Sequence, residues 1–483
     1  MSAITFVAAD TPFTDSGNTA WVLAAAALVL FMTPGLALFY GGMVRTKSVL
    51  NMMMMSFITM GTVGTVWVLW GYSETFGPDA GGGLIGNPFT HFGLKGVLDQ
   101  IYGFVPADAA KGVAAAGGIP APAFVAFQVV FAIIAVALVS GAIADRAKFT
   151  AWTVFTVVWA TLVYFPAAHW VFAFSGYAAE KGGWIANKAD GLLFGGAGAY
   201  DFAGGTAIHI NAGAAGLALA IVLGKRIGFA KDPMRPHNLT LVMIGAGILW
   251  FGWFGFNAGS ALGAGTQAAG VWVNTLAATC TAMLGWLLTE KFRDGHATSL
   301  GAASGVVAGL VAITPACATV SPIGALVVGL VAGVGCALAV GLKFKMGFDD
   351  SLDVVGVHLV GGLIGTLLIG LLATKGSPTG AAGLDVNEGL FYGGGLSQLW
   401  AQFLGAATVL VFSFVVTYLI GLAIHKTMGF RVDEADEVSG VDLSEHAESA
   451  YDITGHSGGR FGSGGAVSTS PSTASKTHEG ASA

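Results

Sequence analysis

Charge is the scarcest property of this sequence. Only 10% of its 483 residues are Asp, Glu, Lys or Arg, whereas soluble globular domains carry about 25% charged residues. This shortage disfavours a water-soluble enzyme. The formal net charge of −6 also excludes a strongly basic nucleic-acid binder, so we expect no nucleic-acid partner.

Cysteine is also rare. The three cysteines, Cys280, Cys317 and Cys336, all lie in apolar runs, which is typical of small buried side chains. Their positions form neither a disulfide framework nor a zinc pattern, and we expect no bound metal and no cofactor. The first 18 residues lack a basic region, so a cleaved signal peptide is not indicated either.

What the sequence has in abundance is long apolar runs, with 54% hydrophobic residues and 74 glycines. A bilayer core about 30 Å thick requires roughly 20 apolar residues per helix. Eleven runs meet this requirement, and they are too continuous for the alternation of a β-barrel. We predict an all-α membrane protein with spans at 19–41, 49–73, 121–143, 149–174, 203–224, 238–258, 268–289, 298–317, 321–342, 352–373 and 396–424.

The few charges fall unevenly on the connections between these spans. Fourteen basic residues lie on one side, in the connections after the odd-numbered spans and at the start of the tail, and five lie on the other side. The positive-inside rule then predicts an outer N-terminus and a cytoplasmic C-terminus. Residues 1–425 carry 17 basic and 18 acidic groups, whereas the remaining residues carry 4 basic and 9 acidic groups. We therefore expect the tail to be acidic and exposed to water.

Two histidines inside the spans have matching surroundings. Glycines follow His209 at Gly213 and Gly216, and they follow His358 at the same offsets, four and seven residues on. These offsets share one helix face, which gives each histidine a smooth strip where another backbone can approach. Spans five and ten run in opposite directions, as in an inverted five-plus-five repeat with an eleventh helix added. At about 1.5 Å per residue both rings lie near the middle of the membrane and could meet there.

A buried histidine pair favours the neutral form of both rings, because burial disfavours the imidazolium. Two neutral rings that share a hydrogen bond suit a small polar solute or a proton relay. The alternatives are two structural core histidines, or a metal site, which lacks a third ligand. Asp201 and Asp353 precede the two histidines at helix starts, where capping is the competing interpretation.

Aromatic residues are candidates for lining a narrow vestibule. Phe127 and Phe131 share a helix face, and the run from Trp250 to Ser260 ends the sixth span. Aromatic faces attract cations. Ordinary packing or an interfacial aromatic belt would give the same pattern.

These residues together resemble the Amt branch of the Amt/Mep/Rh ammonium transporters. The resemblance covers roughly residues 18–453. The motifs that carry it are Phe31–Gly35, Phe39–Gly42, Asp201–Gly213, Gly252–Ser260 and Gly356–His358.

The resemblance implies a role for individual side chains. It makes His209 and His358 the pore histidines, Phe131 and Phe256 a phenylalanine gate, and Trp253 and Tyr164 residues that line or brace the pore. Asp201, Phe127, Phe172 and Ser260 match positions of an outer ammonium-binding site. The chain departs from the family pattern at Phe172, where Trp is usual. Trp170 or a ring from the 175–200 loop is a candidate to compensate.

The resemblance also implies ammonium uptake across the cell membrane by a homotrimer, and control by a PII-type nitrogen signalling protein at the cytoplasmic face. We therefore expect a short outer segment at 1–18, an ammonium-conducting domain at 19–424, a regulatory region at 425–453 and a disordered Ser/Gly-rich tail at 454–483. Two rivals remain. An ammonium sensor acting through the tail would need a signalling partner. An intramembrane enzyme would need a nucleophile or a metal-binding carboxylate at the depth of the histidines, and none is apparent in the spans.

Overall fold

The structure is a computed structural model that describes residues 11–106, 115–174, 183–186 and 198–451. The predictions for the tail at 454–483 and for most of the 175–200 loop fall outside the described residues. Residues 11–450 belong to one compact unit.

The prediction of an all-α protein with eleven spans is confirmed. Within the described residues, eleven helical segments are long and apolar enough to cross a membrane. Five of them are built from one main helix: α1 (Ser16–Met43), α8 (Leu239–Gly259), α9 (Thr266–Asp294), α10 (Ser299–Ala316) and α15 (Ser397–Thr427). The others join two or more segments: η1, α2, η2 and α3 (Thr46–Phe76), α4 and η4 (Ala121–Ile143), α5, η5 and α6 (Phe149–Phe172), η6 and α7 (Gly205–Leu223), α11 and α12 (Pro322–Met346), and η7 and α13 (Val355–Leu372).

Several spans contain a π-helical turn, in which the backbone bonds skip five residues instead of four. Two such turns, η2 (Trp67–Gly71) and η5 (Ala160–Tyr164), lie in spans two and four. The other two, η6 (Gly205–Ile210) and η7 (Val355–Leu359), contain His209 and His358. Each histidine is therefore carried by a short π turn that leads into a regular helix, α7 (Asn211–Leu223) or α13 (Val360–Leu372).

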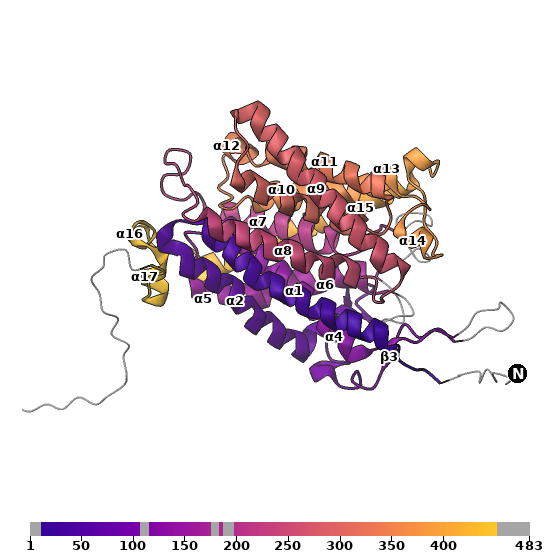
Figure 1. Ribbon diagram of the computed structural model, residues 1–483. Coiled ribbons are helices and arrows are strands. Elements are labelled where there is room, and N and C mark those ends of the chain that lie inside the picture. Colours follow the sequence, from indigo (N-terminus) through magenta and orange to yellow (C-terminus); the bar gives the residue numbers. More distant parts are fainter. Residues whose placement is uncertain (1–10, 107–114, 175–182, 187–197, 452–483) are drawn as a thin grey trace, which may run out of the picture. The chain divides into compact units, whose positions relative to one another are not determined.

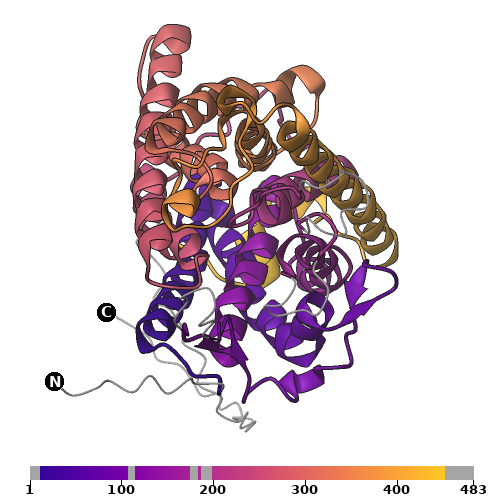
Figure 2. The ribbon, with the colours of Figure 1, turned by 90° about the vertical axis from the view of Figure 1, so that its right-hand side faces the viewer.

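The two halves of the chain pack against each other through equivalent elements. Helix α1, which begins the first half, lies against α8, which begins the second (Figure 1). The π turn η6 packs on α13, and η7 packs on α7. Viewed from the end with the short strands, the first half (indigo to magenta) lies below the second half (salmon to orange) (Figure 2). This reciprocal packing is the arrangement expected of an inverted repeat.

The glycines that follow each histidine make this crossing possible. A Cβ atom on Gly213 would lie 2.5 Å from the backbone nitrogen of Leu359, next to His358. A Cβ atom on Gly362 would lie 3.2 Å from the Cβ of His209 and 3.0 Å from the Gly205 oxygen. The first glycine of each expected strip thus lies where the two histidine spans touch, whereas Gly365, in the second strip, faces Ala312 on α10.

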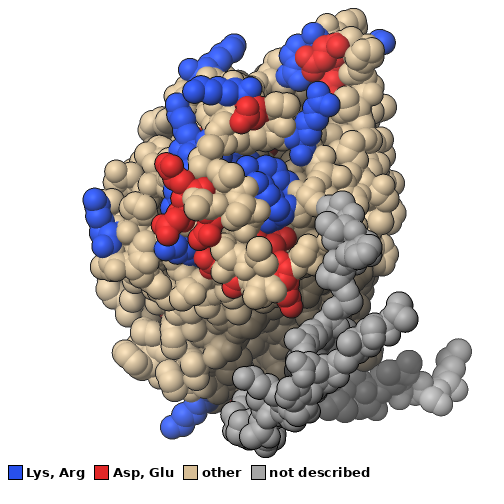
Figure 3. All heavy atoms as spheres, turned by 90° about the vertical axis from the view of Figure 1, so that its left-hand side faces the viewer, with Lys and Arg blue, Asp and Glu red and all other residues tan. Residues whose placement is uncertain are grey.

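The connections on the two ends of the bundle differ in character. One end carries short antiparallel pairs, β1 (Asp79–Ala80) with β2 (Ile85–Gly86) and β3 (Ile101–Tyr102) with β4 (Ile119–Pro120), together with α14 (Pro378–Ala381) and the 3-10 turns η3 (Phe92–Leu94) and η8 (Leu390–Tyr392). The other end carries α12 (Leu342–Met346), α16 (Glu434–Ser439) and α17 (Val441–His446). Lys, Arg, Asp and Glu side chains gather on this second end (Figure 3).

A buried ion-pair network ties the charged end together. The Arg226 guanidinium binds the carboxylates of Asp349 at 2.9 Å and Asp145 at 3.0 Å. Arg146 donates to the Asp349 carbonyl at 2.7 Å. Although burial acts to raise the pKa of the Asp349 carboxyl, its hydrogen bonds to Arg226 and the nearby Arg146 charge outweigh this and hold the pKa below its usual range. The network joins three separate connections.

The tail docks on the same end of the bundle. Asp442 accepts from the backbone nitrogens of Leu50 (3.0 Å) and Asn51 (2.8 Å), at the start of α2 (Val49–Val66). Glu445 accepts from the nitrogen of Phe149 at 2.8 Å, at the start of α5 (Phe149–Trp159). Acidic side chains of the tail thus satisfy the open N–H groups of two spans.

Candidate functional site

The imidazoles of His209 and His358 lie in direct contact. Their Nδ1 atoms are 3.3 Å apart, and the ring planes differ by 19° with centroids 5.3 Å apart. Both residues are almost fully buried, with exposed fractions of 1% and 3%. Since a hydrogen bond needs one donor and one acceptor, one Nδ1 carries a proton and the other does not. The Nε2 atom of His209 is buried and has no hydrogen-bond partner in the described part of the chain.

An aspartate eight residues before each histidine fixes the start of its span. Asp201 accepts from the backbone nitrogens of Gly204, Gly205, Thr206 and Ala207 at 2.6–3.0 Å. Burial raises the pKa of the Asp201 carboxyl, and these four amides oppose the shift. The capping interpretation of Asp201 is therefore correct.

The expectation that Asp353 caps the span of the second histidine, His358, was wrong. Asp350, and not Asp353, caps the span, by accepting from the nitrogens of Val354 at 3.1 Å and Val355 at 2.7 Å. Asp353 has a left-handed backbone with φ of 63° and binds the Lys343 ammonium group at 2.6 Å. The Asp353 backbone carbonyl still accepts from the Val357 nitrogen at 2.9 Å. Its side chain binds Lys343 instead of the open N–H groups, and Asp350 accepts from these groups in its place.

Four aromatic residues lead from the strand-bearing end to the histidine pair. The rings of Phe127 and Phe131 meet edge to face at 4.7 Å, and those of Phe131 and Phe256 at 4.3 Å with a tilt of 37°. Phe256 lies 6.1 Å from the His209 ring. Trp253 stacks on His209 at 5.5 Å and 18°. Aromatic rings therefore cover the strand-bearing side of the pair.

Hydrogen bonds hold the Trp253 ring in this position. Its Nε1 atom donates to the hydroxyl of Thr314 at 2.8 Å, and this hydroxyl lies 3.3 Å from the side-chain oxygen of Asn257. No local sequence pattern singles out Thr314, because it lies 61 residues from its partner in an ordinary apolar span.

Two small cavities flank the histidine pair. One, of about 10 Å³, is lined on its walls by apolar side chains and by both histidines: Met32, Leu36, Phe39, Ile134, Leu138, His209, Leu249, Trp253, Phe256, Val307 and His358. The other, also about 10 Å³, lies on the far side of His358 and includes Ser304 and Asp353. Each holds about one water-sized molecule. A solute passing here would do so without its hydration shell.

A wider pocket of about 280 Å³ lies beside the start of span five. Asp201 and Ser260 are among its lining residues. The Ser260 hydroxyl donates to the Phe256 carbonyl at 2.8 Å. Phe172 does not line this pocket, although its neighbours Val171 and Phe174 do. Of the expected outer-site residues, the structure thus brings only two to this pocket.

The remaining expected residues lie elsewhere in the core. Phe172 is 4% exposed on α6 (Phe165–Phe172), and Tyr164 is 1% exposed in the π turn η5. Trp170, a candidate to compensate for Phe172, donates to the Leu84 carbonyl at 2.8 Å and packs on Trp184. Its indole nitrogen is therefore bonded to the loop that carries β1 and β2, and its ring also packs on Phe412.

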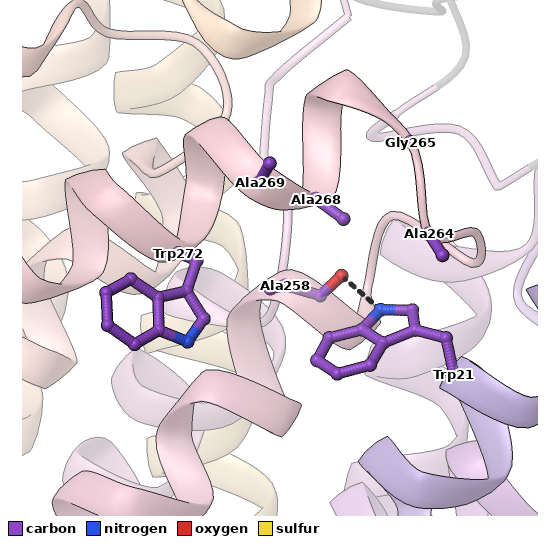
Figure 4. A pocket seen from close by; sticks show the side chains of 7 residues that line it. All are labelled: Trp21, Ala258, Ala264, Gly265, Ala268, Ala269 and Trp272. Atoms are coloured by element: carbon purple, nitrogen blue, oxygen red, sulfur yellow. Dashed lines mark hydrogen bonds between the residues drawn. The ribbon is translucent and has the colours of Figure 1, made fainter.

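A further cavity lies away from the histidines. It has a volume of about 380 Å³ and is lined by Trp21, Ala258, Ala264, Gly265, Ala268, Ala269 and Trp272. The two indole rings flank it, and Trp21 donates to the Ala258 carbonyl at 3.1 Å (Figure 4). The described residues of its lining carry no charged or hydroxyl side chain, and neither His209 nor His358 is among them.

Comparison with known proteins gives a consistent result. Residues 20–451 match the model of the Ammonium Transporter Family. The chain belongs to the ammonium transporter family. An ammonium transporter of Mycobacterium tuberculosis is 60% identical over 92% of both chains, and one of Aquifex aeolicus is 44% identical over 91% of this chain and 94% of the other.

Solved structures of the family have the same fold. Candida albicans Mep2 is 32% identical, with a TM-score of 0.76 over 90% of both chains. A protein described as a sensor Amt protein is 27% identical, with a TM-score of 0.75 over 89% of this chain and 98% of the other. Membership of the ammonium transporter family makes the chain a multi-pass membrane protein of the cell membrane that transports ammonium, and not an enzyme.

Proposed function

We propose that ammonium gives up a proton to water on the strand-bearing side and crosses the chain as ammonia, past His209 and His358. The observation that carries the proposal is the direct contact of the two buried imidazoles at 3.3 Å. The cavities on either side of the pair are the size of one small molecule. Ammonia, which both donates and accepts hydrogen bonds, matches two rings that present one donor and one acceptor.

The walls of this passage favour a neutral solute over a cation. The cavity between Phe256 and His358 has no carboxylate in its lining, and an ion without its hydration shell is costly in apolar surroundings. Selective ion filters use rings of carbonyls or carboxylates to replace that shell. The unpartnered Nε2 atom of His209 is available to bond a molecule of ammonia.

Recruitment of ammonium takes place above the aromatic rings. In this proposal Phe127, Phe172 and Ser260 form the outer site, and Asp201 supports it with negative charge. An aromatic face contributes about 0.5–2 kcal/mol to cation binding. Phe131 and Phe256 form the gate below it, and Trp253 and Tyr164 line or brace the passage.

A current measurement on proteoliposomes tests this proposal. Ammonium pulses should evoke a current if the proton also crosses, and only a rise in internal pH if ammonia crosses alone. The His209→Ala, His358→Ala double variant should lower the flux at least about tenfold. The matched control is His296→Ala, which changes an exposed histidine in the connection before α10. Full flux through the double variant would refute the pore role of the pair.

We also propose the orientation and assembly of the chain. The segment 1–18 and the strand-bearing end lie outside the cell, and residues 19–424 form the ammonium-conducting domain. Residues 425–453 form a cytoplasmic regulatory region that a PII-type protein binds, and a Ser/Gly-rich tail follows at 454–483. The charged end (Figure 3) supports this orientation. The apolar pocket at Trp21 and Trp272 (Figure 4) and exposed side chains such as Ile323 on α11 (Pro322–Ala339) suit contacts in a homotrimer.

Native mass spectrometry tests the assembly. A trimer in mild detergent, and a further mass step on adding a PII-type protein, are expected. A monomer under the same conditions would contradict the trimer. The sensor alternative has less support, because the family and the relatives named above are described as transporters. Growth of transport-deficient cells on limiting ammonium separates the two functions, since only uptake restores it.

A further inference from the structure

The ammonium group of Lys343 occupies a small oxygen-lined position next to the passage. Its Nζ atom donates to the Asp353 carboxylate at 2.6 Å and to the Asp350 carbonyl at 2.9 Å. It also lies 5.5 Å from the centre of the Phe344 ring. A carboxylate, a carbonyl and an aromatic face are groups that bind a primary ammonium ion. The position is thus already filled by a close chemical analogue of the transported ion.

Asp353 connects this position to the histidine pair. Its side chain lines the cavity on the far side of His358, together with Ser304. It also lines a separate pocket of about 200 Å³ that includes Lys343. Only one of its oxygens, Oδ1, has a partner among the described residues, and the side chain is 27% exposed. A solute that leaves His358 therefore meets a carboxylate with a free oxygen.

Comparison of the two halves shows that the fold itself does not require this carboxylate. Five residues before His209 the chain has Gly204, with a positive φ of 124°. Five residues before His358 it has Asp353, with a positive φ of 63°. Glycine adopts this conformation at no steric cost, whereas other residues pay for it. Only the second half places a charged side chain here.

We propose that Asp353 and the Asp350 carbonyl form a release site for ammonium at the inner exit, and that Lys343 competes with the ion for it. The inference rests on the proposed function. Ammonia that passes His358 takes a proton from water, which leaves hydroxide, and the resulting ammonium ion binds Asp353. Lys343 then displaces the ion into the cytoplasm, so that internal ammonium inhibits transport only weakly.

Substitutions of the two partners should act in opposite directions. Lys343→Met removes the competing charge but keeps an apolar stem, so internal ammonium should inhibit at about tenfold lower concentration, the factor of one hydrogen bond to a charged group. Asp353→Asn removes the site, so inhibition should weaken. Asn tolerates the left-handed backbone, which preserves the local fold. The double variant should behave like Asp353→Asn.

The experiment measures methylammonium uptake into proteoliposomes preloaded with graded ammonium, with orientation checked by protease accessibility of a C-terminal tag. Lys345→Met, on the same short helix, is the matched control and should match the wild type. If Lys343→Met and Asp353→Asn shift the inhibition in the same direction, the pair is only structural and the release site is refuted, as it is if neither shifts it. Absence of any uptake by the wild type would instead refute the proposed function.

Discussion

The crossing of the two histidine spans predicts a graded response to added methyl groups. An alanine Cβ at position 362 would lie 3.0 Å from the Gly205 oxygen, about 0.4 Å closer than the ordinary contact limit of 3.4 Å. At position 213 it would lie 2.5 Å from the Leu359 nitrogen, about 0.9 Å too close. Because the nearest obstacle at position 213, and one of the two nearest at position 362, is a backbone atom of the other span, the spans themselves must separate. Overpacking of this kind costs about 1–3 kcal/mol.

The separation acts directly on the histidine contact. The Nδ1 atoms are already 3.3 Å apart, so a further shift of about 0.4 Å takes them beyond hydrogen-bond range. We expect Gly362→Ala to lower ammonium flux several-fold and Gly213→Ala to lower it more. Gly247→Ala, where the described residues place no atom within 4 Å apart from the local helix backbone, should leave flux unchanged and add slight helix stability.

The assay combines flux in proteoliposomes with thermal unfolding in detergent. Flux should fall in the order 247, 362, 213, and the melting temperatures should follow the same order. Wild-type flux in both Gly362→Ala and Gly213→Ala, with normal melting temperatures, would show that the spans do not need this close approach. Loss of flux in Gly247→Ala would show that the effect is unspecific.

Three further outcomes follow from other contacts. Thr314→Val removes the hydrogen bond that holds Trp253, and we expect flux to fall several-fold. The melting temperature should fall less than it does in Gly213→Ala. Unchanged flux would exclude a positioning role for Thr314. Asp442→Asn weakens the cap on α2, so hydrogen exchange at the tail should rise, and equal exchange would contradict docking. Because the pKa of Asp349 is lower in the folded state, its ionised carboxylate stabilises the fold above the unfolded pKa of about 3.9, and this stabilisation is lost as pH falls through the lower folded pKa. Asp349→Asn should remove this acid dependence of the melting temperature. An unchanged pH profile in the variant would contradict the role of Asp349.

The number of spans could be predicted because a bilayer imposes a length on each apolar run. The ends were less exact: the seventh span was expected at 268–289, but α9 covers Thr266–Asp294. Its last turn includes Lys291 and Arg293, and a hydropathy criterion stops before such charges. The helix continues past them because the backbone can stay helical in the aqueous layer.

The approach of His209 to His358 could be anticipated from paired glycines and from depth, since both are local properties of the sequence. The cap at Asp350 was missed because the nearer acid, Asp353, was assumed to start the helix. The eight-residue spacing from Asp201 to His209, repeated from Asp350 to His358, was the signal that could have found it. The link between Thr314 and Trp253 depends on two spans meeting, and no local pattern encodes that.

Nitrogen-15 NMR of the imidazole rings tests the histidine pair most directly. With histidine labelled and the His209→Ala and His358→Ala variants used for assignment, we expect two neutral rings near neutral pH, one protonated at Nδ1 and the other at Nε2, with a hydrogen bond between them. An imidazolium signal from either residue at that pH, or two rings in the same tautomer with no mutual contact, would contradict a shared-proton pair in a dry passage.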